Sequence, residues 1–213
     1  MKSKSISDPR IEFFDSIADK WDAGLDLPVL AHDLDACLAQ FDINESEVVL
    51  DVGCGTGNLT KALLRRLGPA GRVMALDIST RMLALAQGKV DDVRASWHHA
   101  SAEQLPFEDA SIDRVICFSV WPHFENHASV AREFHRVLRP DRQLHIVHLI
   151  SRAKINRIHE EVHHSVKHDH LVGADETADL LTQNLFNVVS MTDDEQRYII
   201  TACKKGWIGD SVP

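Results

Sequence analysis

The chain has 213 residues, with 23 Lys and Arg against 32 Asp and Glu, and a net charge of −9. This length fits one domain of ordinary size with small additions. The acidic balance argues against binding to nucleic acid, because proteins that grip the phosphate backbone normally carry a basic excess. Four scattered cysteines without a CxxC pair argue against a disulfide framework or a four-cysteine zinc site. Without a signal peptide or a membrane span of ~20 apolar residues, we expect a cytoplasmic protein.

Apolar spacing and turn residues predict a regular succession of elements along the chain. Helical spacing predicts two helices first, over 8–21 and 28–41, and a β-branched run then predicts a buried strand over 47–51. Four further strands are expected over 72–77, 94–99, 112–119 and 143–150. The helices between and after them are expected over 58–67, 80–87, 129–138 and about 155–166. A helix over 175–185 and an antiparallel strand pair over 187–191 and 197–203 complete the chain.

This alternation predicts an α/β fold, with a mostly parallel sheet covered by helices on both faces. Ligands bind such sheets at the carboxyl ends of the strands. We expect one domain over 1–213 with four parts. These are a helical N-terminal cover over 1–42, a half that binds the cofactor over 43–150, a His-rich insertion over 151–174, and the C-terminal helix and strand pair over 175–213.

The most specific feature is a glycine loop after the first strand, Leu50-Asp51-Val52-Gly53-Cys54-Gly55-Thr56-Gly57-Asn58. Three glycines let the loop turn tightly and let a ligand approach the backbone. The spacing is GxGxG, and a carboxylate at Asp51 would repel a pyrophosphate but attract a positive centre. An NAD-dependent oxidoreductase is therefore a remote alternative, and a glycine turn that merely connects strand and helix is another. Asp77 ends the next strand and can accept both hydroxyls of a ribose.

Five segments together resemble the class I S-adenosylmethionine (SAM)-dependent methyltransferases, in order and spacing. VVLDVGCGTGNL resembles their first motif and VMALDIS their second; the others are SAEQLPFEDASID, RVICFSVWPHF and REFHRVLRP. The resemblance extends from about residue 13 to 203 and is nearest in character to the ubiquinone and menaquinone biosynthesis methyltransferases. It implies a Rossmann-like sandwich with a seven-stranded, mostly parallel sheet and an antiparallel C-terminal strand. Two departures stand out: Ser101 replaces a common Asp, and Arg139-Pro140-Asp141-Arg142 replaces KPGG, where Asp141 can adopt the left-handed turn.

The resemblance also implies roles for residues around the cofactor. Gly53, Cys54 and Gly55 would pass under the methionine part of SAM, with Asp51 near its amino group. Asp77 would hold the ribose, Ile78 would pack on the adenine, and Ala102 would offer its N–H to the adenine edge. Phe118 and Ser119 would line the site near the sulfonium. The remaining residues expected at the cofactor are Thr56, Gly57, Met82, Ser101 and Glu103.

Two histidines are the candidates for proton transfer to or from a methyl acceptor. A base is needed only where the nucleophile carries a proton at working pH. His123 follows the fourth predicted strand, and His159 lies in the His-rich insertion. Packing beside the site without proton transfer is the alternative for His123. The residues expected to contact the acceptor are Phe14, Trp21, Trp121, His148 and Asn156.

The His-rich insertion contains His159-Glu160-Glu161-Val162-His163, a literal HExxH. This motif places two histidines on one helix face, as in zinc proteases, but the methyltransferase pattern around it argues against a protease. His148, His159 and His163 could instead supply three nitrogen ligands to a divalent metal, which we do not favour. Direct contact with a substrate and a solvated helix face remain open.

The sequence thus predicts a SAM-dependent methyltransferase of a small molecule, with S-adenosylhomocysteine (SAH) as the second product. The alternative is a sensor or metal-binding protein that keeps the SAM fold without turnover. We expect neither nucleic acid nor membrane as a partner. The acceptor atom and the oligomeric state are left open.

Overall fold

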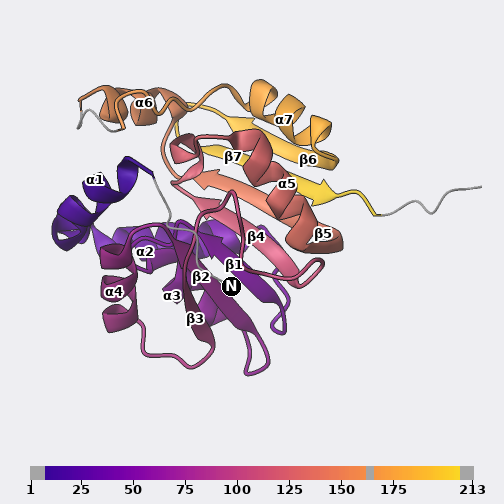
Figure 1. Cartoon of the computed structure of the whole chain (residues 1–213), viewed down its shortest axis with the longest axis horizontal. Helices are drawn as coiled ribbons and strands as arrows, with labels where there is room; N and C mark the ends of the chain where they lie inside the picture. Colours follow the sequence, from indigo (N-terminus) through magenta and orange to yellow (C-terminus); the bar gives the residue numbers. More distant parts are fainter. Residues whose placement is uncertain (1–7, 162–165, 207–213) are drawn as a thin grey trace, which may run out of the picture.

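The computed structural model describes residues 8–161 and 166–206 and holds one seven-stranded sheet in the order β3-β2-β1-β4-β5-β7-β6 (Figure 1). The strands are β1 (Val48–Val52), β2 (Arg72–Asp77), β3 (Ala95–His99), β4 (Ile112–Phe118), β5 (Leu138–His148), β6 (Phe186–Asp193) and β7 (Tyr198–Lys204). The first five strands in chain order pair in parallel, and β7 runs antiparallel to both β5 and β6. This arrangement confirms the expected class I methyltransferase topology.

Nine helical segments connect and cover the strands. They are α1 (Arg10–Ile17), η1 (Ala18–Gly24), α2 (Leu27–Leu38), α3 (Asn58–Arg66), α4 (Thr80–Lys89), η2 (Trp121–His123), α5 (His127–Val137), α6 (Arg152–Glu161) and α7 (Ala174–Gln183), counted over the described residues. The side chains of Asp26, Ser79 and Asn126 each accept a hydrogen bond from the N–H three residues on, which fixes where three of these helices begin.

The first helix differs from its prediction. It ends at Ile17 and tightens into the 3-10 helix η1, where the spacing predicted an α-helix as far as residue 21. Contacts distant in sequence outweigh the local pattern there: the Asp22 carboxylate accepts hydrogen bonds from Thr56, Asn58 and Lys89. α6 ends at Glu161, and the rest of the helix predicted to about 166 falls partly outside the described residues.

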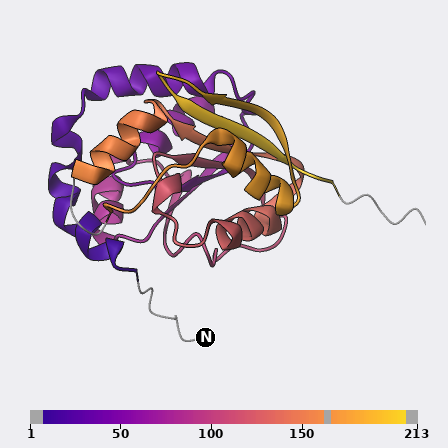
Figure 2. The ribbon, with the colours of Figure 1, turned by 90° about the horizontal axis from the view of Figure 1, so that it is seen from above.

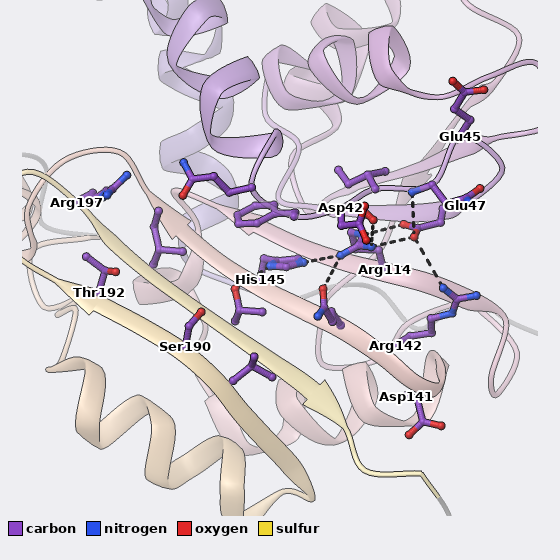
Figure 3. A pocket seen from close by; sticks show the side chains of 18 residues that line it. Asp42, Glu45, Glu47, Arg114, Asp141, Arg142, His145, Ser190, Thr192 and Arg197 are labelled. Carbon is purple, nitrogen blue, oxygen red and sulfur yellow. Dashed lines mark hydrogen bonds and ion pairs between the residues drawn. The ribbon is translucent and has the colours of Figure 1, made fainter.

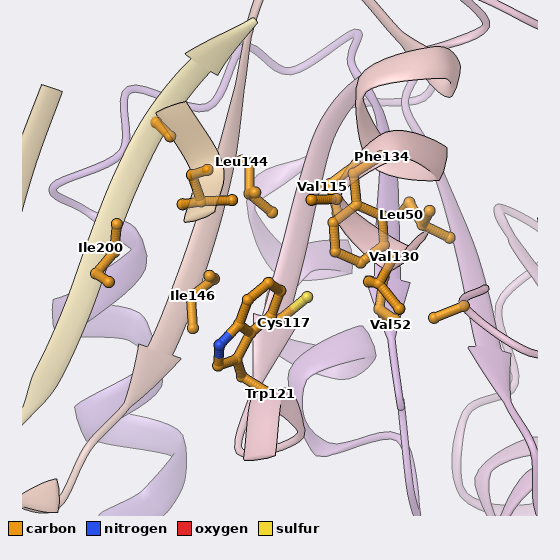
Figure 4. Packing of buried hydrophobic residues seen from close by; sticks show 14 of the residues in the cluster. Leu50, Val52, Val115, Cys117, Trp121, Val130, Phe134, Leu144, Ile146 and Ile200 are labelled. Carbon is orange, nitrogen blue, oxygen red and sulfur yellow. The ribbon is translucent and has the colours of Figure 1, made fainter. Parts of the chain in front are cut away.

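The hydrophobic core forms two layers because neighbouring strand residues point to opposite faces of the sheet. Leu50 belongs to the layer covered by α5 and α7, which also includes Phe134, Leu181 and Trp121 (Figure 4). Val49 belongs to the other layer, covered by α2 and α3. Viewed from above, helices lie on both sides of the sheet (Figure 2). The two layers hold the strand ends that carry the site.

β5 begins directly after α5, five residues earlier than predicted. The segment Arg139-Pro140-Asp141-Arg142 lies inside this strand, and Asp141 has a φ of +61°. An aspartate can occupy this left-handed conformation, as expected from the sequence. The chain therefore turns at Asp141 without a glycine, and β5 continues. Among the described residues, no helix is both long and apolar enough to cross a lipid bilayer.

Candidate functional site

A pocket lies at the carboxyl ends of β1, β2 and β4, where ligands bind in open α/β sheets. Its cavity measures about 80 Å³. The expected site residues that line it are Phe14, Trp21, Gly53, Gly55, Asp77, Ile78, Met82, Ser101, Ala102, Glu103, Ser119 and His123. They come from five segments of the chain, over 14–21, 53–55, 77–82, 101–103 and 119–123, and their individual roles toward a ligand stay predictions.

The glycine loop forms the floor of this pocket. Gly53, Gly55 and Gly57 have φ values of +66°, +52° and +84°, a region that side chains with a Cβ rarely adopt. A Cβ at Gly53 would collide with the side chain of Val120, whereas a Cβ at Gly55 would find only Trp21 Nε1, at 4.0 Å. Gly53 is therefore needed for packing, and Gly55 leaves open space beneath a ligand.

Asp77 presents a buried carboxylate at the end of β2. Its Oδ1 accepts the N–H of Ser79 at 2.8 Å, and its Oδ2 accepts the N–H of Gly55 at 2.9 Å. Burial raises the pKa of Asp77, and these backbone hydrogen bonds act against that rise. The loop and β2 are thus joined by one carboxylate that also faces the pocket.

Asp51 lies beneath the glycine loop and does not line the pocket. It is 1% exposed and its Oδ2 accepts the Thr60 hydroxyl at 2.5 Å. Burial raises its pKa to about 7, opposed by the Thr60 hydrogen bond and assisted by the charge of Asp77. In this structure the Asp51 carboxylate joins the end of β1 to Thr60 of α3. Its expected place near an amino group of the cofactor, directly or through water, stays a prediction.

Four other predicted cofactor residues support the pocket from outside. Cys54 is buried, and burial raises the pKa of its thiol well above the usual value, which makes it a packing residue. The Thr56 hydroxyl donates to Asp22 of η1 at 2.8 Å. Gly57 begins α3, and Phe118 packs in the layer beneath α2. These residues shape the loop without lining the cavity.

α1 and η1 cover the pocket. The ring of Phe14 contacts both Trp21 and His123 edge-on, at centroid distances of 6.1 and 5.2 Å. The cover is attached to the glycine loop and α4 by polar side chains: the Ser79 hydroxyl donates to Asp15 at 2.5 Å, and Lys89 pairs with Asp22 at 2.5 Å.

His123 stands at one wall of the pocket and is held from behind by a carboxylate. Its Nδ1 lies 2.7 Å from Asp169 Oδ2. The ring of His159, on α6, lies beside it at a centroid distance of 4.9 Å, and the Nδ1 of His159 lies 2.5 Å from the backbone oxygen of Asp169. Burial lowers the pKa of His159, so this imidazole is neutral at pH 7.

His148 adjoins this pair at the end of β5. It is 2% exposed, and its Nε2 has no hydrogen-bond partner among the described residues. Burial, together with the charges of His123 and His159, lowers its pKa to about 3. Within the described ranges, no three His, Cys, Asp or Glu side chains are arranged to hold a metal ion, and His163 lies outside these ranges.

Two predicted acceptor contacts are corrected. Trp121 is 1% exposed and packs in the core beneath α5, so it does not reach an acceptor (Figure 4). Asn156 uses its amide on the backbone: its Oδ1 accepts the Leu171 N–H at 2.9 Å and its Nδ2 donates to the Leu171 oxygen at 3.1 Å. Asn156 therefore holds the chain after α6 in place.

Sequence reasoning missed Asp169 and Arg10. Asp169 lies 46 residues from His123 in no recognisable motif, and the only signal was the density of histidines around it. Arg10 is buried in α1, and its Nη1 lies 3.3 Å from Asp169 Oδ1. The spacing of residues in a single sequence cannot predict that Asp169 pairs with His123 and Arg10, because these residues lie in distant segments.

A larger hollow of about 770 Å³ lies toward the amino ends of the parallel strands (Figure 3). Arg114 lies at its floor and pairs with Glu47 through two hydrogen bonds of 2.7 and 2.9 Å. His145 bonds both Arg114 and Thr201. The buried charges of the larger hollow are paired with one another. The glycine loop lies at the opposite end of the strands. We therefore place the candidate site at the smaller pocket.

The sheet order, the glycine loop at its carboxyl edge and the acid at the end of β2 define a class I SAM-dependent methyltransferase. Comparison with known proteins agrees. The family model for a methyltransferase domain matches residues 49–141. The chain has the fold of the class I SAM-dependent methyltransferases, and its sequence is similar to the group named for ubiquinone and menaquinone biosynthesis.

Individual relatives show how far the likeness extends. The ubiquinone/menaquinone biosynthesis C-methyltransferase of Hahella chejuensis is 35% identical over 62% of this chain and 55% of its own length. The malonyl-[acyl-carrier protein] O-methyltransferase of a Marinomonas species is 27% identical over 91% of this chain and 74% of its own. A SAM-dependent methyltransferase of Aquifex aeolicus shares the fold, with a TM-score of 0.73 and 20% identity over 89% of this chain and 98% of that one. The chain spans about half the length of the Hahella chejuensis enzyme and of four demethylmenaquinone methyltransferases that it matches.

Proposed function

We propose that this chain binds SAM in the pocket above the glycine loop and transfers its methyl group to a small molecule. The observation that carries the proposal is the position of Gly55 and Asp77 at the pocket: an open backbone surface beside a buried carboxylate. The carboxylate suits the ribose hydroxyls, and Ile78 and Met82 offer apolar surface to the adenine. The proposed location is the cytoplasm, and the proposed partners include neither nucleic acid nor membrane.

The residues fit the cofactor in chemistry, and the cover must move for it to enter. Pockets for ligands of this size measure roughly 300–1,000 Å³, against about 80 Å³ here. Phe14 and Trp21 of the cover line the cavity, and polar side chains attach the cover to the loop. Outward movement of α1 and η1 therefore enlarges the pocket at the cost of a few polar contacts.

His123 is the proposed general base. When bound, SAM supplies an electrophilic methyl group, and the transfer itself needs mainly proximity and alignment. The Nδ1 of His123 faces the Asp169 carboxylate, so its Nε2 is the nitrogen that can take a proton from the acceptor. His159 and His148 lie close to it. A base at this wall implies an acceptor whose reacting group carries a proton at neutral pH.

The test uses the purified full chain in two steps. SAH binding is measured by calorimetry, and transfer of isotope-labelled methyl from SAM is then followed into a small-molecule extract of the expressing bacterium. We expect SAH to bind, and a labelled product that Gly55→Val abolishes and His123→Ala reduces roughly 10²–10⁴-fold. Absence of SAH binding would overturn the proposal. Binding without any labelled product would favour a sensor of SAM over an enzyme.

A further inference from the structure

Residues from three other segments of the chain meet at Asp169, two at its carboxylate and one at its backbone oxygen. Its Oδ2 lies 2.7 Å from Nδ1 of His123, which follows β4, and its Oδ1 lies 3.3 Å from the guanidinium of Arg10 on α1. Its backbone oxygen lies 2.5 Å from Nδ1 of His159 on α6. The Asp169 side chain is only 11% exposed, so protein groups, not solvent, supply most of its hydrogen-bond partners.

The two contacts to histidine fix where each imidazole carries its proton. A carboxylate oxygen and a backbone oxygen can only accept, so Nδ1 of His123 and Nδ1 of His159 must both donate. A neutral imidazole has one N–H, and its other nitrogen is then a basic acceptor. In the neutral form of each ring, Nε2 is then the acceptor nitrogen, and the centroids of the two rings lie 4.9 Å apart.

The neighbouring His148 argues that this cluster serves more than stability. Its Nε2 is buried without a hydrogen-bond partner among the described residues, which lowers the stability of the fold. Unpaired buried groups in native proteins call for an explanation, and a ligand group is one. His148 therefore adds a third imidazole beside His123 and His159, with one nitrogen that is unpaired among the described residues.

We propose that Asp169 is the positioning residue of the acceptor side of the site. It holds His123 and His159 so that their basic Nε2 atoms face a methyl acceptor with hydrogen-bond donors, such as hydroxyl or amine groups. The inference builds on the proposed function. As the acceptor's O or N atom forms its bond to the methyl carbon, the S–CH₃ bond breaks with its electron pair left on sulfur. The acceptor's proton passes to Nε2 of His123, and Asp169 stabilises the resulting imidazolium.

Arg10 links this orientation to the cover. Its guanidinium bonds the second oxygen of the carboxylate that holds His123, and it also pairs with Asp8 at 2.9 Å. Four residues along α1, Phe14 contacts the His123 ring. One carboxylate thus connects the helix that covers the cofactor pocket with the base that faces the acceptor.

The test is the tautomer of each histidine, read by ¹⁵N NMR of protein labelled in its imidazoles, with SAH bound. In the wild type we expect His123 and His159 to give an unprotonated Nε2. In Asp169→Asn, an amide has one acceptor oxygen for the two donors Arg10 and His123. We therefore expect the His123 signals to shift toward a mixture of tautomers, and the rate of labelled-methyl transfer to fall by at least tenfold with its pH profile displaced.

Asp193→Asn is the matched control, because Asp193, like Asp169, pairs with an arginine. Its partner is Arg152 of α6, whose Nε lies 2.8 Å from Asp193 Oδ2, outside the histidine cluster. It should leave the tautomers unchanged. An unaltered His123 tautomer in Asp169→Asn, or an equal shift in the control, would overturn the positioning role. The NMR measurement needs no acceptor, so failure of methyl transfer in the wild type would count against the proposed function alone.

Discussion

At the scale of single residues, Gly53 and Gly55 of the same loop are required for different reasons. Both have positive φ, but only Gly53 is packed, since a Cβ there would lie 2.8 Å from the Cβ of Val120. Gly55 faces open space. The sequence could predict that this loop turns tightly around a ligand, because the spacing GxGxG requires it. It could not show which glycine is needed for packing, because Val120 is 67 residues away.

We predict that Gly53→Ala and Gly55→Ala separate stability from binding. Left-handed strain should lower the unfolding free energy by about 1–2 kcal/mol in each, and overpacking against Val120 should add about 1–3 kcal/mol for Gly53→Ala. Gly55→Ala should instead weaken SAH binding more than its small loss of stability explains. Urea unfolding and calorimetry check both, and equal effects of the two variants on stability would contradict the assignment.

His148 should make the protein sensitive to mild acid. Its pKa in the folded protein is lowered to about 3 by burial, whereas unfolded histidine titrates near 6.5. Between these values the unfolded chain binds the extra proton, so acid lowers the unfolding free energy. Asp51 acts oppositely: its pKa, raised to about 7, lets the folded state bind a proton first and gain stability as the pH falls toward 3.8.

The difference in unfolding free energy between the wild type and His148→Gln, measured against pH, isolates the contribution of His148. The wild type should lose about 1 kcal/mol relative to the variant between about pH 6 and pH 5. His135→Gln, at a histidine of α5 outside the cluster that is itself only partly buried, is the comparison and should show a smaller change. Parallel stability curves for wild type and His148→Gln would contradict a buried neutral His148.

At the scale of elements, the alternation of strands and helices was predictable because each element buries a periodic apolar face. The sequence predicted that the cover, α1 and η1, would be helical. It could not predict that η1 would be a 3-10 helix, because contacts with a distant loop determine the conformation of η1. Burial works to raise the pKa of Asp22 in this turn, but hydrogen bonds from Lys89, Thr56 and Asn58 outweigh it and lower the pKa. The ionised carboxylate is therefore the stable form at the point where cover and loop meet.

Asp22→Asn should loosen the cover. The variant loses the ion pair with Lys89, which is partly shielded from water, and hydrogen exchange of the amides in α1 and η1 should rise by about 5- to 10-fold, about 1 kcal/mol. Asp19→Asn is the matched control, because its pair with Arg81 is exposed. Equal exchange in the two variants would show that the Asp22 network does not hold the cover closed.

At the scale of the whole molecule, a buried polar network crosses the sheet beneath the larger hollow (Figure 3). It joins Glu47 before β1, Arg114 on β4, His145 on β5 and Thr201 on β7. Burial lowers the pKa of His145, and only a neutral ring can accept from Arg114 while it donates to Thr201. The sequence predicted a buried strand over 47–51 and further strands over 112–119 and 143–150. Its pattern gave no sign that Arg114 in β4 would meet Glu47 before β1.

The last prediction tests whether this network holds the strands as a unit. Arg114→Leu removes both guanidinium hydrogen bonds of Glu47, which is 4% exposed, and leaves Arg142 Nη1 at 3.9 Å as a more distant cation. This loss should cost about 3–5 kcal/mol of unfolding free energy. Glu47→Gln in the same chain removes that charge, so the double variant should lose less than the sum of the single losses, by about 1–3 kcal/mol. The exposed pair of Arg65 and Asp35 is the control cycle and should show a coupling of about 0–1 kcal/mol. The losses of unfolding free energy are measured by chemical unfolding. Additive losses at Arg114 and Glu47 would mean that the two charges are solvated separately. Packing of the two apolar layers alone would then determine the order of the strands.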